Sequence, residues 1–142
     1  MSRYEVTATS KSPAQVEVAA RQFRFLIDQP EQSGGTDEGP TPVEFSLAAL
    51  AGCFNVVLHL VARERGVTIS SLELSAAGDI DPSKLIGKET DARAGFQQVE
   101  LVVRVESDAD PATIRELIEV AEQRCPVSDN LANTTPVRIT LA

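Results

Sequence analysis

The sequence holds few of the residues that metal sites and disulfide scaffolds require, with one histidine and two cysteines among 142 residues. A single histidine cannot form a histidine-rich metal site. Cys53, Cys125 and His59 together still fall short of the roughly four ligands that structural zinc takes. The two cysteines lie too far apart in the sequence for a CxxC redox motif or a zinc knuckle, and two thiols do not make a disulfide scaffold. We therefore expect neither a bound metal nor an organic cofactor.

Aromatic residues and positive charges are also scarce. Aromatics make up 4% of the chain, so Leu, Val, Ile and Ala must fill the core, and the 42% of hydrophobic residues suffices for that. The 13 Lys and Arg residues are outnumbered by 21 Asp and Glu residues, which gives a formal net charge of −8. Because nucleic-acid binding needs a basic surface, this balance argues against nucleic acid as a partner. The length fits one domain, and we predict a single domain over residues 1–142.

Long uncharged apolar runs are absent as well. A membrane helix needs roughly 18 or more such residues. Residues 43–62 come closest, but they contain Glu44, Asn55 and His59. The N-terminal residues, MSRYEVTATSKS, lack the apolar core of a signal peptide. The sequence therefore predicts a cytoplasmic protein without a membrane partner.

Alternating and helical patterns of apolar residues predict an α+β fold with mostly antiparallel strands. Residues 15–28 contain two β-rich pieces, VEV and FRFLI, which form either one hairpin or one long bent strand. Loops rich in Gly, Pro and charged residues separate the elements. The remaining predicted elements are strands over residues 3–10, 67–79, 95–106 and 136–141 and helices over residues 43–65 and 111–124.

The helix predicted over residues 43–65 holds the longest apolar run of the chain. Thr41 can cap its N-terminus, Pro42 suits its first position, and Glu44 lies in the first turn, where the helix dipole favours an anion. Apolar residues surround most of the helix, which predicts a buried central position. Gly66 is a suitable stop at its C-terminus.

Glu44 and Cys53 cannot share a site directly if this helix is straight. The two residues are nine positions apart, which corresponds to about 900° of rotation and places the side chains on opposite faces and roughly 13 Å apart along the axis. Either a third group bridges them or the helix breaks near Gly52. A break would leave Cys53 in the first turn of a second helix, where the dipole lowers the pKa of a thiol. We favour the break.

Cys125 ends the second predicted helix, because Pro126 cannot continue a helix and disfavours helical geometry in the residue before it. Two cysteines at helix ends indicate a pair of thiols that meet in the fold. A thiolate near a positive charge can attack a peroxide and become a sulfenic acid, and a second thiol then converts the sulfenic acid to a disulfide. The alternative is that both cysteines are packing residues, since free cysteine is among the most buried residue types.

The segment GPTPVEFSLAALAGCF, followed about seventy residues later by CPVSDNL, resembles the OsmC/Ohr family of organic hydroperoxide reductases and osmotically inducible proteins. The matching features are Pro-x-Glu leading into an alanine-rich helix and a Gly-Cys pair whose cysteine lies nine positions after the Glu. Two strands next in order and a helix ending in Cys-Pro match as well. The likeness extends from about Val16 to Leu141 and is stronger for the broad OsmC-like branch than for the Ohr proteins. It implies a tightly intertwined homodimer, with long sheets wrapped around two central helices and active sites at the subunit interface.

The resemblance also implies a role for each candidate residue. Cys53 matches the peroxidatic cysteine and Cys125 the resolving cysteine of a thiol peroxidase for organic hydroperoxides, with hydrogen peroxide as a further candidate substrate. Glu44 matches the glutamate that holds an arginine over the thiolate. That arginine would be Arg21, with Arg24 as the second choice, and an external dithiol such as a lipoyl protein would recycle the enzyme. The alternative within the family is a stress-response or binding protein that keeps the fold and thiols but has no arginine aimed at Cys53.

Overall fold

The computed structural model describes residues 1–141. The chain divides into two compact units, Met1–Ser46 and Leu47–Ala142. Helices and antiparallel strands make up its regular structure, which confirms the predicted α+β class.

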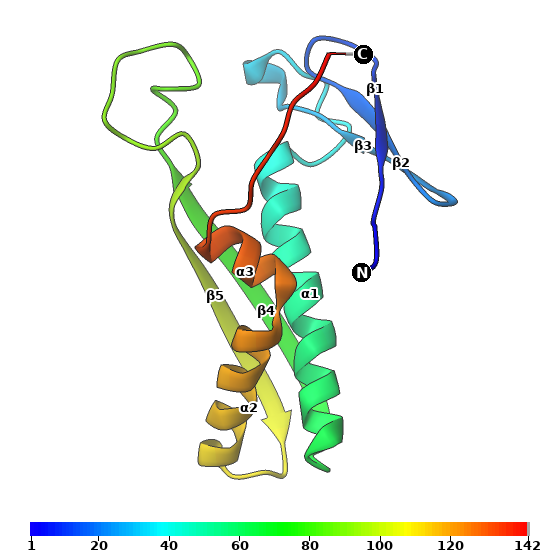
Figure 1. Cartoon of the computed structure of the whole chain (residues 1–142), viewed down its shortest axis with the longest axis vertical. Helices are drawn as coiled ribbons and strands as arrows, with labels where there is room; N and C mark the ends of the chain where they lie inside the picture. Colours follow the sequence, from blue (N-terminus) through cyan, green and yellow to red (C-terminus); the bar gives the residue numbers. More distant parts are fainter. Residues whose placement is uncertain (142) are drawn as a thin grey trace. The chain divides into compact units, whose positions relative to one another are not determined.

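The first unit is built on a three-stranded antiparallel sheet in the order β1-β2-β3 (Figure 1). β2 and β3 form a hairpin, which resolves the choice left open for residues 15–28. A short 3-10 helix, η1 (Glu31–Ser33), follows the sheet. The start of α1 (Pro42–Glu64) packs on the sheet through Phe45, whose ring centroid lies 5.1 Å from that of Phe25. The strands are β1 (Thr7–Ser10), β2 (Val16–Ala20) and β3 (Phe23–Ile27).

A fully buried carboxylate, that of Asp28, organises the loop after β3. It accepts hydrogen bonds from the backbone N–H groups of Gln29, Thr36 and Glu38, at 2.7, 3.2 and 3.2 Å. The Thr36 hydroxyl (2.6 Å) and the Gln15 side-chain amide (3.1 Å) donate to it as well. These donors, led by the Thr36 hydroxyl, hold the pKa of Asp28 well below its usual range, although burial acts in the opposite direction. The loop is therefore closed around an anion that stays charged.

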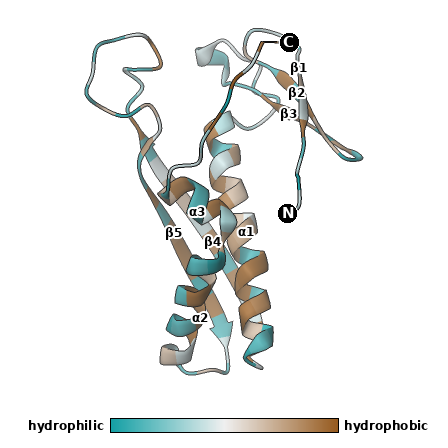
Figure 2. Cartoon of the chain, viewed as in Figure 1, coloured by the Kyte–Doolittle hydropathy of each residue, from teal (hydrophilic) through white to brown (hydrophobic). Residues whose placement is uncertain are grey.

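The second unit is a long antiparallel hairpin with helices packed on one face (Figure 1). Its strands are β4 (Ile69–Ile80) and β5 (Phe96–Ser107), and its helices are the main part of α1, α2 (Pro111–Arg124) and α3 (Pro126–Ala132). Alternate strand residues place apolar side chains under the helices, and the opposite face of the hairpin is mostly polar. Figure 2 shows the apolar residues concentrated on α1 and along both strands. The buried core residues are Leu50, Phe54, Val57, Leu58, Val61, Ala62, Leu117, Ala121 and Cys125.

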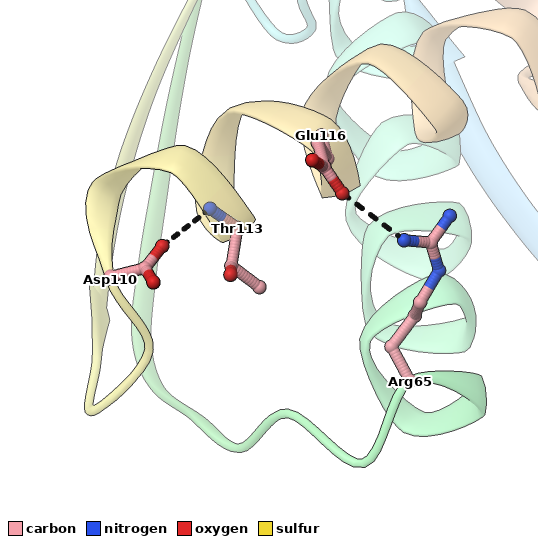
Figure 3. A network of polar contacts seen from close by, with 4 residues as sticks. All are labelled: Arg65, Asp110, Thr113 and Glu116. Atoms are coloured by element: carbon pink, nitrogen blue, oxygen red, sulfur yellow. Dashed lines mark hydrogen bonds and ion pairs between the residues drawn. The ribbon is translucent and has the colours of Figure 1, made fainter.

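Capping groups fix the ends of the helices around this core. The chain leaves α1 at Gly66, which has a left-handed conformation (φ 67°) and donates to the carbonyl three residues earlier, as the sequence predicts. α2 begins after Asp110, whose carboxylate accepts a hydrogen bond from the Thr113 N–H at 2.7 Å (Figure 3). Arg65 and Glu116 form an ion pair of 3.4 Å between the end of α1 and the first half of α2 (Figure 3).

α1 is long and apolar enough to cross a membrane by length and composition alone, with a mean hydropathy of 2.0 over its most apolar window. The expectation that no stretch reaches this level is therefore wrong, because Asn55 and His59 interrupt the run without charging it. In the fold the helix packs over β4 and β5 and supplies most of the core, including Leu58 and Val61, each 1% exposed. Only 33% of the window is buried within the chain, and Val56 is 64% exposed. α1 is thus a core helix with one apolar side that the described chain leaves uncovered.

The strand predicted over residues 136–141 is not formed within the described part of the chain. Its alternating apolar side chains are exposed, with Val137 at 82%, Ile139 at 93% and Leu141 at 102%. A strand requires a hydrogen-bonded neighbour as well as an alternating pattern. The two sheets described here contain β1 to β5 and do not pair with this segment, so the pattern alone does not produce a strand.

Replacing Asp28 by Asn is expected to lower the melting temperature by several degrees at pH 7, because an amide offers one acceptor atom where the carboxylate offers two. The folded-state pKa lies below the ordinary value of 3.8, so the charge stabilises the fold fully above that pH and progressively less below it. The difference in melting temperature between the variant and the wild type should therefore shrink between about pH 4 and pH 2. Thermal melts followed by circular dichroism measure it. The exposed Glu31→Gln is the matched control, and equal stability of wild type and Asp28→Asn at pH 7 would contradict the role of the carboxylate.

Candidate active site

Cys53 lies in the interior of α1, which runs without a break over Pro42–Glu64. The break predicted near Gly52 is therefore wrong, and the helix dipole cannot account for a thiolate at Cys53. A glycine in a helix interior costs about 1 kcal/mol, and the core packing of the apolar residues on either side outweighs it. Of the two arrangements considered for Glu44 and Cys53, only the one with a third, bridging group is compatible with an unbroken helix.

Cys53 and Cys125, which lie far apart in the sequence, are neighbours in the fold. Cys53 is half-buried on α1, and Cys125 is 1% exposed at the joint between α2 and α3. The Cys125 backbone is extended there (φ −82°, ψ 109°), because Pro126 cannot continue α2. Leu117 and Ala121 of α2, both 0% exposed, pack in the same core as α1, and this packing brings Cys125 next to the Cys53 side chain. Both thiols are free.

The surroundings of Cys53 favour the neutral thiol. Burial, the largest influence, raises the pKa of Cys53, the backbone N–H of Val127 lowers it, and the hydrogen bond and charge repulsion from Cys125 raise it again. Among the described residues of the second unit, no Arg or Lys side chain hydrogen-bonds to Cys53. A thiolate at neutral pH therefore needs a cation from outside this group.

α3 begins beside Cys53, and the backbone N–H of Val127 in its first turn lowers the pKa of that thiol. This helix is absent from the sequence prediction. Pro126 at its first position and Asp129 in its first turn are typical of a helix start and could have indicated it. Its seven residues are too few for an apolar periodicity to stand out.

Glu44 forms a capping box with Thr41 at the start of α1. Its Oε2 accepts hydrogen bonds from the Thr41 N–H (2.7 Å) and hydroxyl (2.8 Å), and the Thr41 hydroxyl accepts one from the Glu44 N–H (3.4 Å). The bond from the Thr41 backbone is the main cause of a lowered pKa at Glu44. Both bonds to the carboxylate end on Oε2, and within residues 1–141 none ends on Oε1, so that atom can accept a further donor. The cap confirms the predicted start of the helix, and the contact of Glu44 with an arginine stays a prediction.

Arg21 and Arg24 lie at the turn between β2 and β3. Arg21 is one of the two turn residues, has a positive φ of 54°, and holds its guanidinium over the Phe23 ring, 5.1 Å from the centroid. Arg24 donates to the carbonyl groups of Arg21 (3.4 Å) and Phe23 (3.1 Å). Both side chains are exposed, and neither forms an ion pair with another described residue. Each therefore keeps its charge available for an anion, and which of them meets Cys53 stays a prediction.

Metal-binding groups are not gathered near the thiols. Within residues 1–141, no group of three His, Cys, Asp or Glu side chains is placed to hold a metal ion. His59, the single histidine, is exposed on α1, with its Nδ1 atom 3.0 Å from the Asn55 carbonyl oxygen. The expected lack of a metal or organic cofactor stays a prediction.

Removing the Cys125 sulfur is expected to lower the pKa of Cys53. In Cys125→Ala the hydrogen bond and repulsion that raise this pKa are lost, whereas the burial of Cys53 remains. The pH profile of Cys53 alkylation should therefore move to lower pH. Iodoacetamide labelling, with mass spectrometry of the Cys53 peptide, measures the profile. Cys125→Ser keeps a hydroxyl that can hydrogen-bond and should move the profile less; an unchanged or upward-shifted profile in Cys125→Ala would show that Cys125 does not influence Cys53.

Curated proteins and a family model match the chain along most of its length. The model of the OsmC-like protein family matches residues 35–140. The hydroperoxide reductase of Mycoplasma pneumoniae is 23% identical over 137 residues, which are 96% of this chain and 92% of that protein. The hydroperoxide reductase of Mycoplasma genitalium is 20% identical over 99% of this chain and 94% of that protein.

Solved structures share the fold. An OsmC-like protein from Mycoplasma pneumoniae has a TM-score of 0.80 at 23% identity, covering 92% of this chain and 88% of that one. The organic hydroperoxide resistance protein OhrB of Bacillus subtilis has a TM-score of 0.59 at 25% identity, covering 90% and 89%. The family match includes Glu44 and both cysteines, whereas Arg21 and Arg24 precede it. The resemblance drawn from the sequence is confirmed, and the chain belongs to the OsmC-like protein family.

Proposed function

We propose that this OsmC-like protein is a thiol peroxidase that reduces organic hydroperoxides through Cys53 and Cys125. The observation that carries the proposal is the contact between two free thiols from distant parts of the chain. Neighbouring cysteines can exchange between dithiol and disulfide, and this exchange supplies the two electrons that reduction of a hydroperoxide needs. Relatives named hydroperoxide reductase and organic hydroperoxide resistance protein support the class of substrate.

In the proposed reaction the Cys53 thiolate attacks the terminal oxygen of the hydroperoxide. The O–O bond breaks, the alkoxide takes a proton from solvent and leaves as the alcohol, and Cys53 becomes a sulfenic acid. The Cys125 sulfur then loses its proton and attacks the Cys53 sulfur, and the hydroxyl group leaves with that proton as water. The product is a Cys53–Cys125 disulfide. Hydrogen peroxide would react in the same way and give water in place of the alcohol.

We assign to an arginine the role of keeping the Cys53 thiol ionised. Because the surroundings of Cys53 raise its pKa, a cation beside the sulfur is required. Arg21 and Arg24 have no ion-pair partner among the described residues, and the Oε1 atom of Glu44 is open to a donor. A guanidinium suits the task because it stays charged and can bind two anions through separate N–H groups. The guanidinium would contact the Glu44 carboxylate on one side and the Cys53 thiolate on the other. It would thus be the bridging group that the unbroken α1 requires.

An external dithiol is proposed to reduce the disulfide, and a lipoyl group is a dithiol of the required kind. Cys125 is 1% exposed and Cys53 is more accessible, so we assign the attack of the reductant to the Cys53 sulfur, with Cys125 as the leaving thiolate. Thiols that cycle in this way require a reducing compartment, which is the reason for proposing the cytoplasm.

The peroxidase reaction predicts a distinct outcome for each substitution. Wild-type protein mixed with cumene hydroperoxide should lose both thiols, and Cys53→Ser should lose the activity. Cys125→Ser should reduce one equivalent and stop with Cys53 as a sulfenic acid. One of Arg21→Gln and Arg24→Gln should slow the reaction by about tenfold or more, because each unit of pKa changes the thiolate fraction roughly tenfold, and the other arginine variant is its matched control.

Stopped-flow thiol counting over a range of hydroperoxide concentrations measures these rates. A wild-type rate no faster than that of free cysteine at the same pH would exclude the enzyme. That result would favour the second candidate, a binding or stress-response protein that keeps the fold and thiols. The raised pKa of Cys53 is the observation in favour of this second candidate.

A homodimer is proposed as the working form. Residues 136–141 expose alternating apolar side chains and are not paired with either described sheet. α1 keeps an apolar side, including Val56, that the described chain leaves uncovered. A second copy that pairs with the segment and covers the helix would account for both features, in line with the intertwined dimer that the resemblance implies.

Ile139→Asp is expected to shift the protein from dimer to monomer, because a charge would enter the buried face of a strand between subunits. Thr140→Asp is the matched control, since neighbouring side chains of a strand point to opposite faces. Sedimentation velocity at micromolar protein concentration measures the dimer fraction. A wild-type monomer, or equal effects of the two substitutions, would contradict the pairing of this segment.

A further inference from the structure

We propose that the ion pair between Glu64 and Arg124 is a latch that positions Cys125 for attack on Cys53, a role that rests on the proposed thiol chemistry. Glu64 is the last residue of α1, the helix that carries Cys53, and Arg124 is the last residue of α2. Cys125 follows Arg124 directly in the sequence. The latch therefore ties the joint that carries one thiol to the helix that carries the other.

The latch is a bidentate contact. Arg124 Nη1 donates to Glu64 Oε2 at 2.6 Å, and Arg124 Nη2 donates to Glu64 Oε1 at 3.1 Å. Two N–H···O bonds in parallel fix the orientation of the arginine as well as its distance. The hydrogen bond from Arg124 lowers the pKa of Glu64, so the pair stays charged over the pH range in which thiols react.

The joint at Cys125 has few other polar restraints. Its N–H bonds to the Glu122 carbonyl at 3.3 Å in place of the carbonyl four residues back, and Pro126 has no N–H to donate. In the described chain, the latch is the only ion pair that links the last turn of α2, or any residue of α3, to another helix or strand. The direction in which Cys125 faces therefore depends on the packing of α2 and on this one ion pair.

Attack of one sulfur on another is sensitive to small displacements. A disulfide needs Cα atoms roughly 4.4–6.8 Å apart and a dihedral angle of about 90°. A misplacement of about 1 Å can slow a reaction by up to 100-fold. Both latch side chains are partly exposed, at 47% and 39%, and such ion pairs contribute little to stability. Loss of the latch should therefore leave the fold intact and change the alignment of the two sulfurs.

A second ion pair between the same helices provides a matched control. Arg65 contacts Glu116 through a single nitrogen–oxygen distance of 3.4 Å (Figure 3). Glu116 lies about two turns before Arg124 on α2, away from the joint. Replacing Arg65 by Gln breaks this similar ion pair without releasing Cys125.

The reagent 4,4′-dithiodipyridine tests the attack step without a peroxide. The Cys53 thiolate forms a mixed disulfide with one half of the reagent and releases one 4-thiopyridone. The Cys125 thiolate then attacks the Cys53 sulfur, releases the second 4-thiopyridone and leaves the Cys53–Cys125 disulfide, and the two thiol protons end on the two thiopyridone molecules. The second phase of absorbance follows this intramolecular step, and Cys125→Ser, which lacks it, gives the baseline. Because no hydroperoxide is involved, failure of the latch and failure of the peroxidase are observed separately.

Arg124→Gln and Glu64→Gln should each slow the second phase by roughly tenfold and leave the first phase unchanged. Arg65→Gln should leave both phases unchanged. Arg124→Lys should restore part of the rate, and the exchange of Glu64→Arg with Arg124→Glu should restore more, which a purely structural loss would not show. A second phase as fast as that of the wild type in Arg124→Gln, or equal slowing in Arg65→Gln, would overturn the latch. If Arg124→Gln does not fold, the rates of the second phase in Glu64→Gln and in the exchanged pair test the latch in the same way.

Discussion

The candidate site depends on the packing of α2 with α1 over the apolar face of the β4–β5 hairpin. Leu117 and Ala121 of α2 are completely buried there, and Phe54, Val57, Leu58, Val61 and Ala62 of α1 are buried with them. Full burial of an aliphatic side chain such as Leu117 contributes about 1.5–3 kcal/mol, more than an exposed ion pair at a helix end. Pro126 then stops α2 at the residue that meets Cys53. The thiol pair is therefore a product of the core of the second unit, and the ion pair of Glu64 adjusts a contact that the core has already made.

Alignment and activation of the thiols have separate origins in this interpretation. The core that aligns the sulfurs also desolvates Cys53, and the two effects of burial oppose each other, because a buried thiol is a poor source of thiolate. The polar groups proposed for activation are those of the first unit, the capped carboxylate of Glu44 and the guanidinium groups of Arg21 and Arg24. Asp28 serves that unit as an internal anion that closes the loop before α1. A reactive cysteine in such an arrangement stays neutral until a cation reaches it.

Much of the fold could be predicted because its signals are local. Alternation identifies β4 and β5, and the capping residues Thr41, Asp110 and Gly66 mark helix ends within a few positions. The break near Gly52 was a wrong prediction because the cost of one glycine is local, whereas the core contacts that keep α1 continuous come from α2 and the hairpin. The strand over residues 136–141 has the right alternation, but its formation depends on a neighbour that the described chain does not offer.

The site was harder to predict than the fold, because its contacts join residues that lie far apart in the sequence. The donors to Asp28 are spread over the chain from Gln15 to Glu38 without a period, so the sequence did not reveal them. α3 is too short to show a pattern, although its Val127 N–H lowers the pKa of Cys53. The two cysteines were expected to meet because both were placed at helix ends, although Cys53 lies inside α1, and the resemblance to the OsmC/Ohr family assigned their separate roles.

The most direct measurement is a peptide map of the cysteines after reaction with one equivalent of cumene hydroperoxide. Equal amounts of unlabelled and 15N-labelled protein are unfolded, mixed and refolded, so that any oligomer contains both kinds of chain. The protein is oxidised, the remaining thiols are blocked, and the digest is analysed by mass spectrometry. The arrangement described here predicts one cross-linked peptide that contains Cys53 and Cys125 of the same isotopic composition. A Cys53 sulfinic acid with Cys125 still reduced, or a cross-link between labelled and unlabelled chains, would contradict it.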